Sequence, residues 1–131
     1  MRGWPLVCAA LLAACSVATS PAAELDQEFR LRYLEQAVLD GGRLTVSFRE
    51  VPSDSRCPVD AQCIQAGEAT VVLSLAKPGR EASVVALRTT PGKDIASYGE
   101  YRVELRRLDP APRVRGIPPG SYVATLRIHR E

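Results

Sequence analysis

Histidine and methionine are both scarce in this chain. Among its 131 residues are one histidine, His129, and one methionine, Met1. Nucleophilic triads most often need a histidine base beside the nucleophile. His129 lies close to the C-terminus, on a segment whose pattern suggests the end of an edge strand, so we expect a surface residue there. The sequence therefore predicts no catalytic residues and a protein that is not an enzyme.

Long apolar runs are also missing. A transmembrane helix needs about 20 consecutive apolar residues, and no segment approaches that length. The longest run, Pro5–Ala14, has ten residues, which as a helix would cover about 15 Å, half of the ~30 Å hydrocarbon core. It follows a positively charged start at Arg2, and this combination is typical of a secretion signal.

The apolar run ends in Leu12-Ala13-Ala14-Cys15, which resembles the lipobox of bacterial lipoproteins. The resemblance implies that residues 1–14 are a signal peptide and that Cys15 becomes the lipidated (palmitate-bearing) first residue. Two or more acyl chains anchor a protein stably, so the protein would be held in a membrane of the cell envelope, facing the periplasm. The alternative is cleavage after Ala22, which would give a soluble periplasmic or secreted protein.

The chain also has no large excess of either acidic or basic residues, since the formal net charge is only +2. Nucleic-acid binding usually needs a strongly basic face, so we expect no nucleic-acid partner. Residues 101–131 are nevertheless locally basic, with seven arginines. Alternation along strands would by itself place these arginines on solvent-facing positions, and the alternative is a patch for an anionic partner.

The remaining sequence has the alternation of β-strands. Residues 15–27 are small or polar and are predicted to form a lipidated N-terminus and flexible tether. Apolar residues then alternate with polar ones, or form dense short runs, over 29–33, 35–39, 44–49, 68–76, 81–89, 101–106 and 122–129. Turn signals separate these runs, Pro52 is expected to end the third, and loops are expected over 52–67, 90–99 and 109–120.

This pattern predicts an all-β protein. We expect residues 28–131 to form a single antiparallel β-sandwich of about seven strands, immunoglobulin-like in the loose sense, with a small open β-barrel as the alternative. The apolar density of 68–76 predicts a central strand buried on both faces. The aromatic residues that alternate with polar neighbours are expected mainly in the core, namely Phe29, Tyr33, Phe48, Tyr98, Tyr101 and Tyr122.

One segment is distinctive. Residues 54–71 begin Asp-Ser-Arg-Cys-Pro, contain a second cysteine and continue through Ala-Gly into a strand. The segment resembles one shared by small exported bacterial proteins, a family with no assigned activity, so the resemblance implies a fold and no chemistry. Because Cys57 and Cys63 are an even pair in an exported chain, they are expected to form a disulfide.

The segment has several possible roles. A structural role is favoured, in which a disulfide holds a crossover between strands, Gly67 permits a bend, and Arg56 pairs with Asp54, Asp60 or Glu68. These four charged residues are also the candidate binding loop. A metal site is disfavoured because the cysteine spacing is wide for zinc and no second Cys or His pair exists. Thiol redox chemistry is also disfavoured, because it usually needs two residues between the cysteines and a helix N-terminus, and the sequence indicates neither.

Together these features indicate a non-catalytic cell-envelope lipoprotein. Its partners would be the membrane, through the lipid anchor, and an envelope protein or ligand that the sequence does not identify, bound by loops at the ends of the sandwich. We expect no cofactor and no metal. The alternative function is a small-ligand or metal-binding periplasmic protein that uses the Cys57–Cys63 loop, and an accessory to a hydrolase or inhibitor is a third hypothesis.

Overall fold

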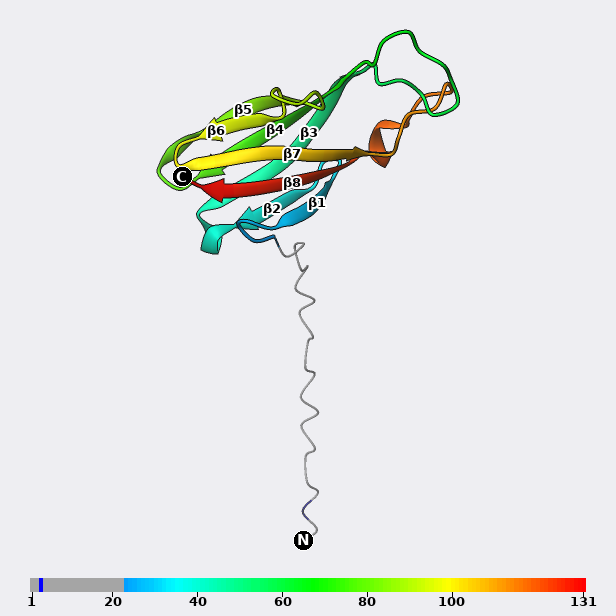
Figure 1. Ribbon diagram of the computed structural model, residues 1–131. Coiled ribbons are helices and arrows are strands. Elements are labelled where there is room, and N and C mark those ends of the chain that lie inside the picture. The colour runs from blue at the N-terminus through cyan, green and yellow to red at the C-terminus, as the bar shows by residue number, and fades with distance from the viewer. Residues whose placement is uncertain (1–2, 4–22) are drawn as a thin grey trace.

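The computed structural model describes Gly3 and residues 23–131, and these form two antiparallel four-stranded sheets (Figure 1). Apart from Gly3, the expected signal peptide 1–14 lies outside the described residues, as do Cys15 and the expected alternative cleavage position after Ala22. The strands are β1 (Glu28–Arg32), β2 (Gln36–Leu39), β3 (Leu44–Asp54), β4 (Ala69–Lys77), β5 (Arg80–Arg88), β6 (Ile95–Tyr98), β7 (Tyr101–Asp109) and β8 (Val123–Arg130). Two short 3-10 turns, η1 (Asp40–Gly42) and η2 (Pro119–Ser121), complete the described elements.

The strand order is β1-β8-β7-β6 in the first sheet and β2-β3-β4-β5 in the second. Among the described strands, the chain crosses from one sheet to the other between β1 and β2 and again between β5 and β6. Within each sheet, adjacent strands are therefore also consecutive in sequence, except that β8 pairs with β1. The predicted β-sandwich is confirmed, and the sheets are not closed into a barrel. The likeness to immunoglobulin domains lies in this two-layer architecture. No helix among the described residues is long and apolar enough to cross a membrane.

The core lies between the two sheets and is built from the inward positions of every strand. Leu44, Val46 and Phe48 on β3 are fully buried, because alternate residues of a strand face the same side. Five of the six aromatic residues expected in the core are buried there, and Tyr33 packs edge-on against the Phe48 ring with the two ring centroids 5.8 Å apart. Burial of these rings supplies much of the apolar area that stabilises a small sandwich.

The prediction differs from the structure first in the strand count, which is eight rather than seven. β6 (Ile95–Tyr98) lies inside the expected loop 90–99, and its four residues include only one buried side chain, Tyr98, so it has almost no periodic signal. β3 also continues past Pro52 to Asp54. Register shifts on either side of Glu50 mark bulges there, and a proline is tolerated in a strand where the ladder is interrupted.

Two expectations about strand position were wrong. β4 is central in its sheet but buried on one face only, because Thr70, Val72 and Ser74 face outwards and a two-layer sandwich leaves each sheet one outer face. β8 is not an edge strand, since it lies between β1 and β7. His129 is therefore half-buried on the outer face of an inner strand, opposite Arg102.

The sandwich has two different ends. The terminal end holds the tight turns at 40–42, 78–79 and 99–100 together with the C-terminus. Residues 23–27, expected in the tether, also lie there: Leu25 packs against the core and Asp26 donates its backbone N–H to the carbonyl of Ile128 at 2.8 Å. The tip end carries the two longest connections, which project beyond the sheets (Figure 1).

Candidate binding site at the tip of the sandwich

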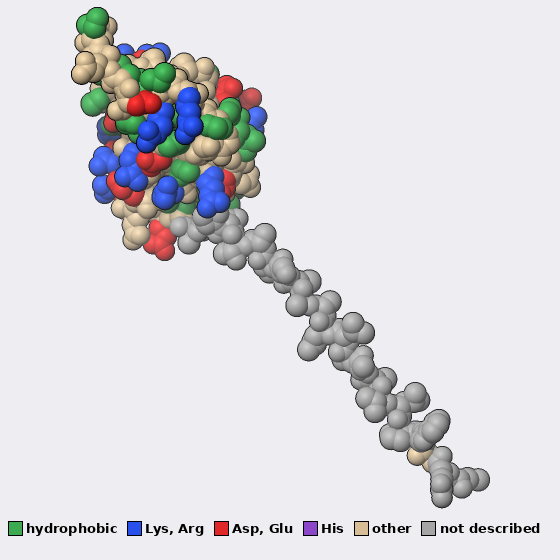
Figure 2. All heavy atoms as spheres, turned by 90° about the vertical axis from the view of Figure 1, so that its right-hand side faces the viewer, with side chains coloured by type: hydrophobic (Ala, Val, Ile, Leu, Met, Phe, Trp, Pro, Cys, Tyr) green, Lys and Arg blue, Asp and Glu red, His purple; other side chains and the backbone are tan. Residues whose placement is uncertain are grey.

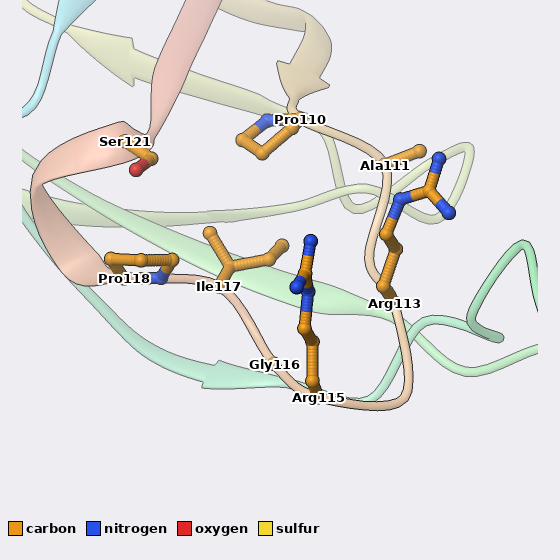
Figure 3. Close-up of a pocket in the computed structure, with 8 residues that line it drawn as sticks. All are labelled: Pro110, Ala111, Arg113, Arg115, Gly116, Ile117, Pro118 and Ser121. Carbon is orange, nitrogen blue, oxygen red and sulfur yellow. The ribbon is translucent and has the colours of Figure 1, made fainter.

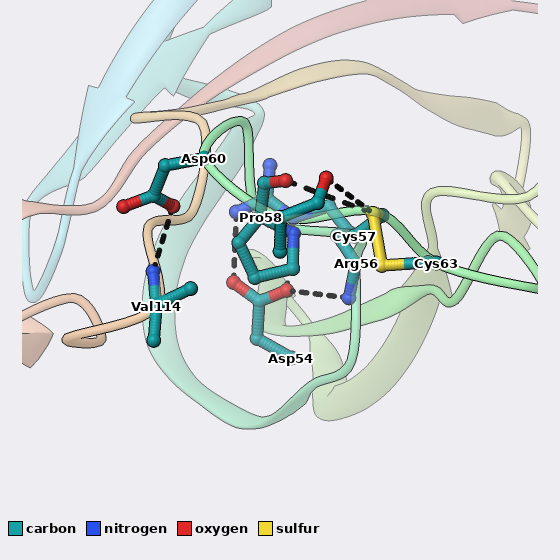
Figure 4. Close-up of a disulfide and its surroundings, with 8 residues drawn as sticks. Asp54, Arg56, Cys57, Pro58, Asp60, Cys63 and Val114 are labelled. Atoms are coloured by element: carbon teal, nitrogen blue, oxygen red, sulfur yellow. Dashed lines mark hydrogen bonds and ion pairs between the residues drawn. A yellow bond between two sulfur atoms is a disulfide. The ribbon is translucent and has the colours of Figure 1, made fainter.

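Two loops that are far apart in sequence lie side by side at the tip end. We call residues 55–68 and 110–118 the tip. The backbone N–H of Val59 donates to the carbonyl of Pro112 at 2.9 Å, and that of Val114 donates to Asp60 Oδ1 at 2.9 Å (Figure 4). The loops therefore satisfy part of each other's backbone hydrogen bonding, which favours one fixed arrangement.

The predicted disulfide between Cys57 and Cys63 is present in the tip, with its Cα atoms 5.9 Å apart. Within the short loop that it closes, the N–H of Ala61 donates to the carbonyl of Pro58 at 3.1 Å. A disulfide stabilises mainly by reducing the freedom of the unfolded chain. Here it restricts the part of the first loop that contacts the second.

Arg56 connects the two loops. Its Nε and Nη2 atoms donate to the two carboxylate oxygens of Asp54 at 2.9 and 2.8 Å, so the ion pair is bidentate. Nη1 also donates to the carbonyl of Leu108 at 2.7 Å, and Nη2 to that of Pro110 at 3.1 Å. Of the three partners expected for Arg56, Asp54 is the one that the fold provides. The planar guanidinium suits this role because it presents several donors in a fixed geometry.

Tyr122 completes this network from the other sheet, since its hydroxyl donates to Asp54 Oδ2 at 2.9 Å. Burial by itself would raise the pKa of Asp54, but the hydrogen bonds from Arg56 and Tyr122 hold that pKa below its usual value. Burial, together with the hydrogen bond to Asp54, raises the pKa of Tyr122 to about 12. At neutral pH Asp54 is therefore charged and Tyr122 is a neutral donor.

The other two candidate loop residues have different partners. Asp60 accepts the N–H of Val114, as described above, while Glu68 accepts hydrogen bonds from Thr90 Oγ1 at 2.6 Å and Arg88 Nη1 at 3.2 Å. The four charged residues are thus not one site. Asp54 and Arg56 belong to the network at the base of the tip, and no three His, Cys, Asp or Glu side chains of residues 23–131 form a group that could hold a metal ion.

Gly67 allows the first loop to close. A Cβ atom at this position would lie 1.6 Å from the carbonyl oxygen of Ser55, so no other residue fits without a backbone shift. The hydroxyl of Ser55 forms two hydrogen bonds with the backbone of Glu68. It donates to the Glu68 carbonyl at 3.0 Å and accepts from the Glu68 N–H at 3.1 Å. The bend expected at Gly67 is therefore a close approach between two backbone segments.

A pocket of about 640 Å³ lies beside the second loop (Figure 3). It is lined by Pro110, Ala111, Arg113, Arg115, Gly116, Ile117, Pro118 and Ser121. Arg113 and Arg115 form no ion pair with any residue that the structure describes. Sequence reasoning did not select these residues. The only signals were the basic character of residues 101–131 and the proline content of the loop.

The tip also exposes aliphatic side chains. Val59, Ile64 and Val114 are 61%, 103% and 68% exposed, and all three lie on the two loops. Figure 2 views the molecule from this side and shows hydrophobic and basic side chains interspersed over the surface. Exposed apolar groups on a fixed scaffold are typical of a recognition surface. The tip can therefore offer aliphatic contacts next to two guanidinium groups.

Comparison of the chain with known protein families, with curated proteins and with solved structures found no match.

Proposed function

We propose that the protein is a non-catalytic, lipid-anchored module of the cell envelope that binds a partner protein through its tip. The observation that carries this proposal is the exposure of Val59, Ile64 and Val114 on two loops that the disulfide and Arg56 hold in place. A loop that is already ordered loses less conformational entropy on binding, so exposed aliphatic groups on it are more effective contacts.

The position of the tip supports the same proposal. Residues 23–27 lie at the terminal end, and β1 runs from there towards the tip end, where Arg32 pairs with Val123. A lipid on Cys15 would therefore hold the terminal end near the membrane, and residues 15–22 could extend over about 28 Å at most. The tip would point away from that membrane and towards other envelope components.

Small-ligand binding remains the second candidate, because the pocket of about 640 Å³ falls within the usual range for ligand sites. The metal-binding form of that alternative has less support. Cys57 and Cys63 are joined in a disulfide, and the carboxylates of Asp54 and Asp60 accept hydrogen bonds from Arg56 and Val114.

The binding proposal can be tested by photo-crosslinking in living cells. A photoreactive amino acid would replace Val59, Ile64 or Val114 in the full chain, with Val84 on β5 as the matched control, since Val84 and Val114 are each 68% exposed. We expect the same protein to be captured from all three tip positions and not from Val84. Equal capture from Val84, or different products from each tip position, would contradict binding through the tip.

The lipid anchor requires a separate measurement, namely the intact mass of the protein purified from the envelope. A chain that begins at Cys15 and carries acyl mass would support the anchor, and Cys15→Ser should release the protein from the membrane fraction. A chain that begins at Ala23 without acyl mass would contradict the anchor. The protein would then act in soluble form in the periplasm or medium.

A further inference from the structure

We propose that the Arg113–Arg115 pocket binds a carboxylate group of the partner protein, supplied by its chain terminus or by an Asp or Glu side chain. This inference rests on the proposed function and specifies the chemistry that the tip recognises. It is carried by the placement of two arginines in one pocket, by the donors that surround them and by the aliphatic groups beside them.

The geometry brings both guanidinium groups to one concave surface. Arg113 and Arg115 are two residues apart on the second loop and both line the pocket, with Arg115 beside Ile117 and Arg113 beside Ala111 (Figure 3). The rings of Pro110 and Pro118 and the side chain of Ile117 form the apolar part of the lining. A charged group could therefore reach the arginines while an attached apolar group contacts the wall.

The charge of these arginines is not compensated locally. Arg56, in the same tip, has a bidentate carboxylate partner, whereas Arg113 and Arg115 have no ion-pair partner among residues 23–131. Asp60 is the acidic residue that contacts the second loop, and its Oδ1 accepts the N–H of Val114. Two like charges held near each other attract an anion, and a partly enclosed site strengthens that attraction.

The lining of the pocket offers donors that a carboxylate can use. The N–H of Gly116 donates to the carbonyl of Arg113 and that of Ser121 to the carbonyl of Pro118, whereas the N–H groups of Ala111, Arg113, Arg115 and Ile117 have no hydrogen-bond partner among residues 23–131. The guanidinium groups and the Ser121 hydroxyl are the side-chain donors of the lining. A guanidinium matches the two oxygens of a carboxylate in a bidentate arrangement.

A protein segment is the source of carboxylate that fits the surroundings of the pocket. Val114 lies between the two arginines in sequence and is 68% exposed, and Val59 is brought close to it by the contacts between the loops. A carboxylate flanked by aliphatic side chains would therefore reach the arginines while its neighbours contact the apolar lining of Pro110, Ile117 and Pro118, and the exposed valines lie on the same two loops.

The test is a titration of the processed full chain, purified from cells, followed by NMR shifts of the Gly116 and Ser121 amides. The probes are the capped peptides acetyl-Ala-Val-Leu with a free carboxyl terminus, the same peptide as its amide, acetyl-Ala-Glu-Leu amide, and inorganic phosphate. We expect one or both acidic peptides to bind roughly tenfold more tightly than the neutral amide and than phosphate. Their relative affinities distinguish a chain terminus from an acidic side chain.

Arg113→Gln with Arg115→Gln should weaken binding of the acidic peptide roughly tenfold. The matched control is Arg43→Gln with Arg49→Gln, two exposed arginines on other parts of the fold. Arg113→Lys with Arg115→Lys keeps the charge and should give intermediate affinity, because the fork geometry is lost. Unchanged affinity in the Gln pair, an equal loss in the control pair, or equal binding of the neutral amide or phosphate would each overturn the inference.

This outcome can be separated from that of the proposed function. Crosslinking from Val59 and Ile64 does not depend on the arginines, so capture of one partner together with unselective peptide binding would refute only the carboxylate pocket. Selective binding of acidic peptides without capture of any partner would support the pocket and refute the proposed protein-binding role in the cell.

Discussion

The two ends of the sandwich use the same kind of contact to join the sheets. At the tip end the hydroxyl of Tyr122, next to β8, donates to Asp54 on β3 at 2.9 Å. At the terminal end the hydroxyl of Tyr101, on β7, donates to Asp40 after β2 at 2.6 Å. In each case the tyrosine comes from the first sheet and the aspartate from the second, and an arginine lies close to the carboxylate.

The ends differ in what the arginine does. The Arg56 side chain is 16% exposed and makes two short contacts with Asp54 in addition to its bonds to the carbonyls of Leu108 and Pro110. Arg130 is 46% exposed and reaches Asp40 at 3.5 Å. The terminal end is closed by short turns that satisfy their own backbone, whereas the tip end has two long loops whose carbonyls need external donors. Loop length thus explains why only the tip end needs a partly buried guanidinium that donates to backbone carbonyls.

The largest effect should come from removing that guanidinium. Arg56→Met leaves the partly buried carboxylate of Asp54 without its counter-charge and frees two carbonyls, so we expect a loss of about 3 kcal/mol in the free energy of unfolding. Arg130→Met, at the other end, should cost only about 0.5 kcal/mol, because exposed pairs contribute little. Urea unfolding followed by circular dichroism measures both variants.

A double variant makes the comparison sharper. Asp54→Asn removes the buried charge that Arg56→Met leaves alone, so the double variant should be no less stable than Arg56→Met by itself. If the two single losses add in full, or if Arg130→Met costs as much as Arg56→Met, the two ends do not differ in the role of their arginine.

Glycine also has different roles at the two ends. At Gly67 in the tip there is no room for a side chain. The added Cβ of Gly67→Ala must displace the Ser55 backbone, and we expect the free energy of unfolding to fall by about 2.5 kcal/mol. Gly41 at the terminal end has φ +64° and open space around it, so Gly41→Ala should cost about 1 kcal/mol through backbone strain alone.

Gly120 in η2 is the control for these glycine variants. It has neither a positive φ nor an atom within 4 Å of the added Cβ, and Gly120→Ala should leave stability unchanged within about 0.5 kcal/mol. Thermal unfolding of the three variants should rank them in this order. A Gly67→Ala protein as stable as Gly120→Ala would show that the loop can relax around the added methyl group.

The disulfide should have a somewhat smaller effect. The two cysteines are six residues apart, and a loop that short contributes about 2 kcal/mol through the unfolded state. Cys57→Ser with Cys63→Ser should lower the melting temperature, while alkylation of the native wild-type protein should find no free thiol at these positions. A reactive thiol at Cys63 in the native protein would contradict the disulfide.

The sandwich could be predicted from the sequence because its strands have a local signal. Alternation at Leu44, Val46 and Phe48 marks a face of β3 whatever the strand pairs with. The position of a strand in its sheet could not be predicted where it depends on a partner far away in sequence. β8 is an inner strand only because β1 pairs with its outer edge, and the paired residues Glu28 and Arg127 lie at opposite ends of the domain sequence. Pro52 was misread because the bulges that accommodate it are properties of the β3–β4 pair.

In the candidate site, too, only the contacts between residues close in sequence could be predicted. The ion pair of Arg56 with Asp54 spans two positions, and the sequence included it among three options. Tyr122 lies 68 positions from Asp54 and Leu108 lies 52 from Arg56, so their roles depend on which loop ends meet at the tip. The pocket around Arg113 and Arg115 depends on loop conformation, which apolar periodicity does not encode.

The two tyrosines should contribute less than Arg56, Gly67 or the disulfide. Burial and an aspartate partner raise the pKa of Tyr101 and of Tyr122 to about 12, above the ordinary value of 10.0. The unfolded chain releases these protons near pH 10 while the folded protein keeps them, so stability should be full below pH 10 and decline between about pH 10 and 12. Tyr101→Phe and Tyr122→Phe should each cost about 1 kcal/mol at pH 7 through the lost hydrogen bond and should each reduce the alkaline decline.

The dependence of stability on acid pH should distinguish the two ends. The folded-state pKa of Asp54 lies below its ordinary value of 3.8, so its contribution to stability is present above that pH and is lost as the pH falls through the lower, folded-state pKa. Tyr122→Phe removes one of the donors that lower this pKa, so the acid loss that Asp54 produces should be smaller and should be complete at a higher pH than in the wild type. Tyr101→Phe leaves the Asp54 network intact and should not move the part of the acid profile that Asp54 produces. Stability measured from pH 2 to pH 7 in both variants decides this, because identical shifts would mean that the network around Asp54 is not specific to the tip end.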